Sequence, residues 1–203
     1  FGVHFSDGVL AHPNKLGAPV VLCASYTDEA VEKHSAFNRM QAWGYGVSVP
    51  TAVALDYSQV KDFEVYPVLV TGDSAWIEHE TKDMVDGEFV CNPAAGEKEG
   101  NYAVLINLSR KIGDKEQRII ISGDSDFITN EEFGLTRPGM EVNNFEVITG
   151  SFRWLSYDAY PIYTDRIGAI DNGINLSGGW RVWIKLFFMI LFPAFLVGTG
   201  VTI

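Results

Sequence analysis

The sequence predicts an α/β fold, with a mostly parallel sheet layered by helices and one transmembrane helix at the C-terminal end. Apolar runs such as Val20–Ala24 and Arg118–Ser122 are nearly continuous, which is typical of strands covered on both faces. Helical patterns lie between some of these runs, so helices packed on a sheet are the simplest arrangement that buries them. The last 18 residues, Leu186–Ile203, carry no charge.

The strands are expected where apolar runs stand between turn signals. Gly17-Ala18-Pro19 precedes the first run, and Gly123 ends the last. The residues from Thr27 to Trp43 permit a helix over part of their length, whereas Val47–Leu55 is rich in β-formers and interrupted by Pro50. The remaining predicted strands are Tyr66–Thr71 and Tyr102–Leu108.

The best amphipathic helix before the C-terminal run is Asn143–Leu155. Asn143 and Glu146 resemble a capping box, the arrangement in which a side chain binds the free N–H groups of a first turn. One helix face is apolar, with residues at helical spacing: Phe145, Ile148, Phe152 and Leu155. Thr129 precedes two acidic residues and predicts another, shorter helix start.

The C-terminal run has the length and composition of a membrane anchor. At 1.5 Å per residue it measures about 27 Å, close to the thickness of the hydrocarbon layer of a bilayer. Trp180 and Trp183 stand before it, where indoles favour the interface, and Lys185 can extend to the headgroups. Pro193 is expected to kink the helix.

We therefore expect three parts: a soluble domain over 1–156, an irregular juxtamembrane segment over 157–180, and a transmembrane helix over 181–203. The first residue is Phe1, and the chain stops inside the apolar run, so we expect the sequence to be a piece of a longer protein.

Charge and cysteine content exclude several classes of function. All 26 acidic residues but only 13 of the 15 basic residues precede Arg181, which gives this part a net charge of −13. Such a charge repels nucleic acids and anionic headgroups, so no nucleic-acid partner is expected. Cys23 and Cys91 form neither a disulfide framework nor a zinc signature, and Cys23 is expected to be a buried, inert thiol. No cofactor is predicted.

The most suggestive local segment is the loop Gly123-Asp124-Ser125-Asp126-Phe127, which follows a predicted strand. In α/β sheets, ligand sites commonly lie at the carboxyl ends of strands. Three interpretations remain open. Asp124 and Asp126 could hold Mg²⁺, they could cap backbone N–H groups, or the loop could belong to a docking or ligand surface. The motif is similar to one found in NYN/PIN-like nucleases, and Asp-x-Asp to haloacid-dehalogenase phosphatases, but the further acids of either family are not found.

Several segments in this order resemble GldG-like auxiliary proteins of ABC-2-type transport systems, the family associated with gliding motility. The likeness covers about the last 140 residues and depends on the order of the motifs. They are Tyr66–Thr71 with Ser74–Glu78, Tyr102–Arg110, Arg118–Asn130, Asn143–Ser156 and the terminal span.

The resemblance implies a non-catalytic domain similar to glutamine-amidotransferase-like and intraflagellar-transport-52-like folds. It further implies an extracytoplasmic domain at the inner membrane, next to an ABC-2-type permease and its ATPase. The expected function is therefore a non-enzymatic accessory domain that acts through protein contact and is anchored in the bilayer. Two alternatives are a membrane-tethered Mg²⁺-dependent phosphoesterase using Asp124 and Asp126, and an extracytoplasmic ligand-binding sensor.

Overall fold

The computed structural model describes the chain except for residues 14–18, 81–89, 136–138, 161–177 and 202–203. Two compact units are present, Phe1–Ile162 and Tyr163–Ile203.

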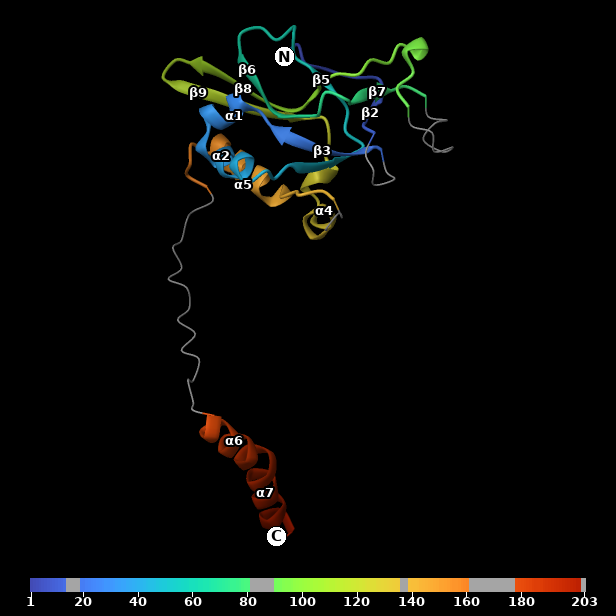
Figure 1. The fold of residues 1–203 in the computed structure, drawn as a ribbon. Coiled ribbons are helices and arrows are strands. Elements are labelled where there is room, and N and C mark those ends of the chain that lie inside the picture. The colour runs from blue at the N-terminus through green and yellow to red at the C-terminus, as the bar shows by residue number, and fades with distance from the viewer. Residues whose placement is uncertain (14–18, 81–89, 136–138, 161–177, 202–203) are drawn as a thin grey trace. The chain divides into compact units, whose positions relative to one another are not determined.

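The first unit is built on a five-stranded antiparallel sheet that curls into a half-barrel (Figure 1). Its strand order is β4-β3-β6-β8-β9. The bounds are Val21–Tyr26 for β3, Val47–Pro50 for β4, Glu64–Val70 for β6, Ala103–Ile112 for β8 and Lys115–Ser122 for β9. The hairpin β8–β9 keeps an unbroken register from Leu105↔Ser122 to Ile112↔Lys115. Gly113, at φ +61°, supplies the left-handed residue in its tight turn.

The predicted α/β fold with a mostly parallel sheet is wrong, because every strand pair of this sheet is antiparallel. The expected similarity to glutamine-amidotransferase-like and intraflagellar-transport-52-like folds is wrong for the same reason. Of the strands predicted from apolar runs, β8 is buried on both faces over most of its length, whereas β3 alternates between buried and exposed residues. Helices cover only one face of the sheet. The opposite face packs against the segment from Leu55 to Phe63 and against Val3, around Ile106 and Leu108. Non-helical chain therefore does the covering that a second helical layer does in a parallel α/β fold.

Two small antiparallel sheets complete the β structure of the described residues. One pairs β1 (His4–Phe5) with β5 (Leu55–Asp56), and the other pairs β2 (Val9–Ala11) with β7 (Trp76–Glu78). The 3₁₀ helix η1 (Pro93–Ala95) follows β7.

Helices cover the other face of the main sheet. These are α1 (Asp28–Lys33), α2 (Ser35–Ala42) and α5 (Asn144–Leu155); α2 and α5 lie below β3 in the view of Figure 1. The predicted helix Asn143–Leu155 is confirmed, and Asn143 caps it by accepting a hydrogen bond from the N–H of Glu146 at 3.3 Å. Gly150 lets α5 approach α2 closely, because a Cβ there would lie 2.6 Å from the ring of Phe37.

The free edge of β4 is covered by the chain that leads into α5. The N–H of Gly46 donates to the carbonyl of Glu141 at 2.9 Å, and the N–H of Asn143 donates to the carbonyl of Gly46 at 3.0 Å. This contact extends the sheet by one bridge and fixes where α5 begins.

The second unit contains a continuous helix formed by α6 (Gly178–Leu186), η3 (Phe187–Leu191) and α7 (Phe192–Val201). Its segment Val182–Gly200, 19 residues with a mean hydropathy of 2.0, is long and apolar enough to span a membrane. None of this segment is buried against other parts of the described structure. By its length and composition, the helix indicates association with a membrane.

Candidate functional site

The loop Gly123–Phe127 is held in place by backbone contacts on both sides. The N–H of Gly123 donates to the carbonyl of Val104 at 2.8 Å, and the N–H of Val53 donates to the carbonyl of Gly123 at 2.9 Å. A Cβ at residue 123 would stand 2.0 Å from the oxygen of Val53, so only glycine allows the two chains to approach this closely.

Asp124 turns back into its own loop. Its Oδ1 accepts a hydrogen bond from the N–H of Asp126 at 2.8 Å, which is an Asx turn. Ser122 Oγ donates to the carbonyl of Asp124 at 2.7 Å and accepts from its N–H at 3.2 Å. The backbone-capping interpretation is therefore realised in the structure.

Partial burial also changes the acidity of Asp124. Burial raises the pKa of this carboxyl to about 6, and the charge of Asp126 adds to the increase, while backbone N–H groups oppose it. Oδ2 is buried and, among the described residues, has no hydrogen-bond partner. The folded protein therefore makes ionisation of Asp124 less favourable than ionisation of an ordinary aspartate.

The remaining loop residues differ in exposure. Ser125 and Asp126 are exposed, and Asp126 begins the 3₁₀ helix η2 (Asp126–Ile128). Thr129 donates to the carbonyl of Asp126 at 2.8 Å and caps α4 (Asn130–Gly134), which confirms the helix start predicted there. Phe127 is buried in the main core. The loop therefore points one carboxylate outward and an aromatic ring inward.

The loop does not assemble a larger set of metal ligands in the part of the chain that the structure describes. No group of three or more His, Cys, Asp or Glu side chains there is arranged to hold a metal ion. Asp124 and Asp126 are brought together, as the sequence predicts, but a backbone N–H occupies the oxygen that Asp124 directs toward Asp126. The geometry fits a structural turn better than a hard-cation site.

Asn144 is the important residue that sequence reasoning missed. Only 4% of it is exposed, and its amide joins three backbone groups from distant segments. Oδ1 accepts from the N–H of Ser48 at 2.9 Å, and Nδ2 donates to the carbonyls of Ser48 at 2.9 Å and Phe127 at 3.0 Å. The loop, the edge strand β4 and the start of α5 are therefore joined by one side chain. The Asn143-Asn144 pair signalled a helix cap but not this second role.

Two buried carboxylates were also missed. Glu97, 4% exposed, accepts from the N–H of His79 at 3.3 Å and from the N–H of Asn92 at 2.6 Å. Glu78, 2% exposed, accepts from Trp76 Nε1 at 3.1 Å and from the N–H of Glu80 at 2.9 Å. Glu97 thus binds the backbone N–H groups of His79 and Asn92 and holds these two residues near each other. In so acidic a chain, no local signal distinguishes these two residues from the surface acids.

A cluster formed by Glu116, Arg118, Trp154 and Tyr157, which we call the α5 clasp, fixes the C-terminal end of α5 to β9. The guanidinium of Arg118 lies 4.0 Å from the ring centroid of Tyr157 and 5.2 Å from that of Trp154, and it pairs with Glu116 at 2.8 Å. Arg118 donates to the carbonyl of Trp154 at 2.5 Å, and the hydroxyl of Tyr157 donates to the carbonyl of Glu116. Tyr157 and Asp158 have φ values of +55° and +63°, so the chain turns sharply here.

The prediction that Cys23 is buried is wrong. Leu22, Ala24 and Tyr26 point into the core, so the alternation along β3 leaves Cys23 on the exposed side.

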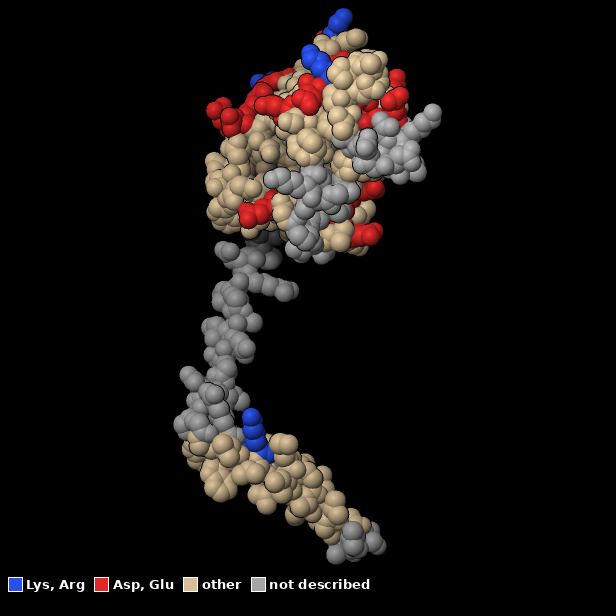
Figure 2. Space-filling model, turned by 45° about the vertical axis from the view of Figure 1, so that its right-hand side comes forward, with Lys and Arg blue, Asp and Glu red and all other residues tan. Residues whose placement is uncertain are grey.

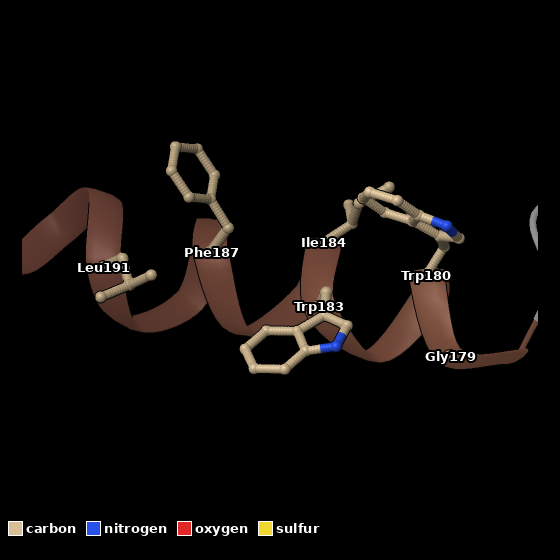
Figure 3. A pocket seen from close by; sticks show the side chains of 6 residues that line it. All are labelled: Gly179, Trp180, Trp183, Ile184, Phe187 and Leu191. Atoms are coloured by element: carbon tan, nitrogen blue, oxygen red, sulfur yellow. The ribbon is translucent and has the colours of Figure 1, made fainter.

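The predicted anchor residues all lie on the C-terminal helix. Figure 3 shows an open hollow on the surface of that helix, lined by Gly179, Trp180, Trp183, Ile184, Phe187 and Leu191. Trp183 points away from Trp180 and Ile184, so indole groups face in different directions around the helix. Lys185 lies in the last turn of α6. Apolar side chains on all sides suit a lipid environment.

Pro193 follows a widened turn of the same helix. Phe187–Leu191 forms a π-helical segment, closed by the N–H of Phe192 donating to the carbonyl of Phe187. Proline has no N–H and crowds the preceding turn, and a widened turn relieves that crowding. No charged residue follows Lys185 in the sequence, and on the side visible in Figure 2 the helix shows charged side chains only near its start.

Comparison of the chain with protein-family models, with curated proteins and with solved structures finds no match.

Proposed function

We propose that this protein is a membrane-anchored accessory domain that acts through contact with neighbouring membrane proteins, and that those neighbours are an ABC-2-type permease and its ATPase. The observation that carries the proposal is the apolar helix Val182–Gly200, none of which is buried and which belongs to a unit separate from the folded domain. A helix without a polar face needs lipid or protein around it, so an anchoring role follows most directly.

The geometry of the candidate loop supports a contact function over chemistry at that loop. Asp124 is engaged by the backbone of its own loop, and Phe127 is packed into the core. We infer the transporter as the partner from the order and spacing of the motifs that resemble GldG-like proteins. From the same resemblance we infer that the domain lies on the extracytoplasmic side of the inner membrane.

The test uses the full chain expressed in its native membrane. After extraction in mild detergent, the protein should co-purify with a permease and an ATPase, and before extraction it should resist release by alkaline carbonate. Repeated isolation of the protein alone would contradict the accessory role, whereas release by carbonate would contradict the anchor.

A matched pair of variants separates anchoring from folding. Leu191→Arg combined with Leu196→Arg places two charges in the helix, and each is expected to oppose insertion by about 3 kcal/mol. This variant should leave the membrane fraction, whereas Leu191→Ile with Leu196→Ile should remain there. Both should keep the circular dichroism of the sheet domain. Equal membrane retention of the two variants would contradict a spanning helix.

A further inference from the structure

The outer side of α5 carries an exposed row of large apolar side chains, although its inner side is already packed on the sheet. Val147, Gly150 and Trp154 are buried, whereas Phe145 and Phe152 are each 60% exposed on the opposite side. A helix that is apolar on both sides is normally covered on both.

This row continues onto α4, which lies on the same side of the sheet (Figure 1). Phe133 is 40% exposed, and its ring meets that of Phe145 edge to face, with centroids 6.2 Å apart. Leu155 and Ile128 are also exposed. We call Phe133, Phe145, Phe152, Leu155 and Ile128 the aromatic face. The three phenylalanines together expose about 300 Å², which is the size of the largest apolar patch on a typical monomer, and such patches are often functional.

The surroundings of the aromatic face are acidic. From Asp124 to Leu155 the sequence has six acidic and two basic residues. Exposed or partly exposed carboxylates on the elements that form the face are those of Asp126, Glu131 and Glu146. Arg153, the basic residue of α5, pairs with Asp158 at 3.2 Å.

The acidic surroundings distinguish between three possible partners of the aromatic face: a bilayer surface, a second copy of this chain and another protein. Helices that lie in a bilayer interface carry Lys and Arg on their polar side, because anionic headgroups repel carboxylates. A second copy bound through the same face would bring acidic rims together. An apolar groove bordered by Lys and Arg on another protein is complementary in both respects.

The chain length limits where that protein lies. Only 17 residues, 161–177, separate the described part of the domain from Gly178, and a fully extended chain of that length covers at most about 60 Å. If the helix is in the bilayer, this length of chain tethers the domain to that bilayer, and a protein held in the same membrane is within its reach.

We propose that the aromatic face docks into an apolar groove, bordered by lysine and arginine, on a protein held in the same membrane. The location of the partner rests on the proposed function; the chemistry of the groove does not. The aromatic area is below the roughly 800 Å² that each partner contributes to a standard interface, so the contact is weak by itself. Confinement of both proteins to one membrane supplies the missing affinity through a high effective concentration.

The test compares Phe145→Ser/Phe152→Ser with the control Phe5→Ser in the full chain. Phe5 is exposed to a similar extent, 54%, but lies on β1, outside the aromatic face. The double variant should unfold at the same temperature as the wild type and remain in the membrane fraction. After detergent extraction, roughly tenfold less partner should co-purify with it. The control should recover as much partner as the wild type. Raising the salt from 50 to 500 mM should also lower recovery of the partner by the wild type.

A photo-crosslinking phenylalanine analogue at position 152 identifies the occupant. An adduct with a membrane protein, absent when the analogue is at position 5, is expected. An adduct with lipid or with a second copy would overturn the proposal. Full recovery of the partner by the double variant would overturn it as well and leave the accessory function intact. Absence of any partner in the wild type would instead refute the accessory function.

Discussion

Removing the amide of Asn144 should cost more stability than any other change near the candidate loop. Asn144→Ala leaves one N–H and two carbonyls of the buried backbone without their partner. Leaving a buried polar group unsatisfied costs about 1–3 kcal/mol, and partial relaxation reduces the total, so we expect a loss of about 3–4 kcal/mol.

Two further variants show whether the loss comes from these hydrogen bonds. Asn144→Asp has the same shape and keeps an acceptor for the N–H of Ser48, but places a second carboxylate oxygen against two carbonyls. It should therefore also be strongly destabilised, and less so at pH 4, where a protonated carboxyl can donate once. Asn143→Ala removes only a helix cap and should cost about 1 kcal/mol.

The assay is urea unfolding of the full chain in detergent, monitored through the circular dichroism of the sheet domain. A loss below 1 kcal/mol for Asn144→Ala would refute the reasoning. So would an Asp variant as stable as the wild type at pH 7, because the two carbonyls would then not require a donor.

Other perturbations test the remaining features by the same unfolding assay. Gly123→Ala should lose about 1–3 kcal/mol, because the new methyl group meets the carbonyl of Val53; a neutral result would show that the two chains can separate freely. The pKa of Asp124 is raised to about 6 from an unfolded value near 4, so the folded state resists its ionisation and stability should fall as pH rises from about 4 to 6. Asp124→Asn keeps the acceptor for the N–H of Asp126, so its free energy of unfolding should rise relative to that of the wild type as the pH rises over that interval. A difference in unfolding free energy that does not change with pH would contradict the raised pKa. Glu97→Ala frees two N–H groups and should expose the adjoining segment to limited proteolysis, whereas Glu99→Ala should not.

The sequence predicted elements better than their arrangement. Asn143 and the helix that it begins are local features, and the structure confirms them. The predicted apolar face is not the buried one, because Phe145, Phe152 and Leu155 are exposed while the side of the helix with Val147 and Trp154 is packed. Strand direction is not local, because a strand buried on both faces shows the same apolar run in either orientation. No pattern in the sequence indicated that residues 55–63 cover one face of the sheet. The sequence analysis therefore wrongly expected helices on that face.

The candidate site shows the same limit. Asp124 and Asp126 are adjacent in sequence, so their shared turn was one of the predicted alternatives. Asn144 acts on Ser48, 96 residues away, and no spacing rule connects the two. Contacts of this kind depend on the tertiary fold and become visible only once the chain is folded.

The α5 clasp has a mechanical consequence. Any tension that reaches the domain along the chain from its C-terminal helix arrives just beyond Asp158. Among the contacts that pass this load to β9 are the stacking of the Arg118 guanidinium on Tyr157 and the hydrogen bond from the Tyr157 hydroxyl to the carbonyl of Glu116. Replacing Arg118 with leucine should therefore lower the rupture force when the domain is pulled by its C-terminal end, while the force measured between two internal strands stays the same.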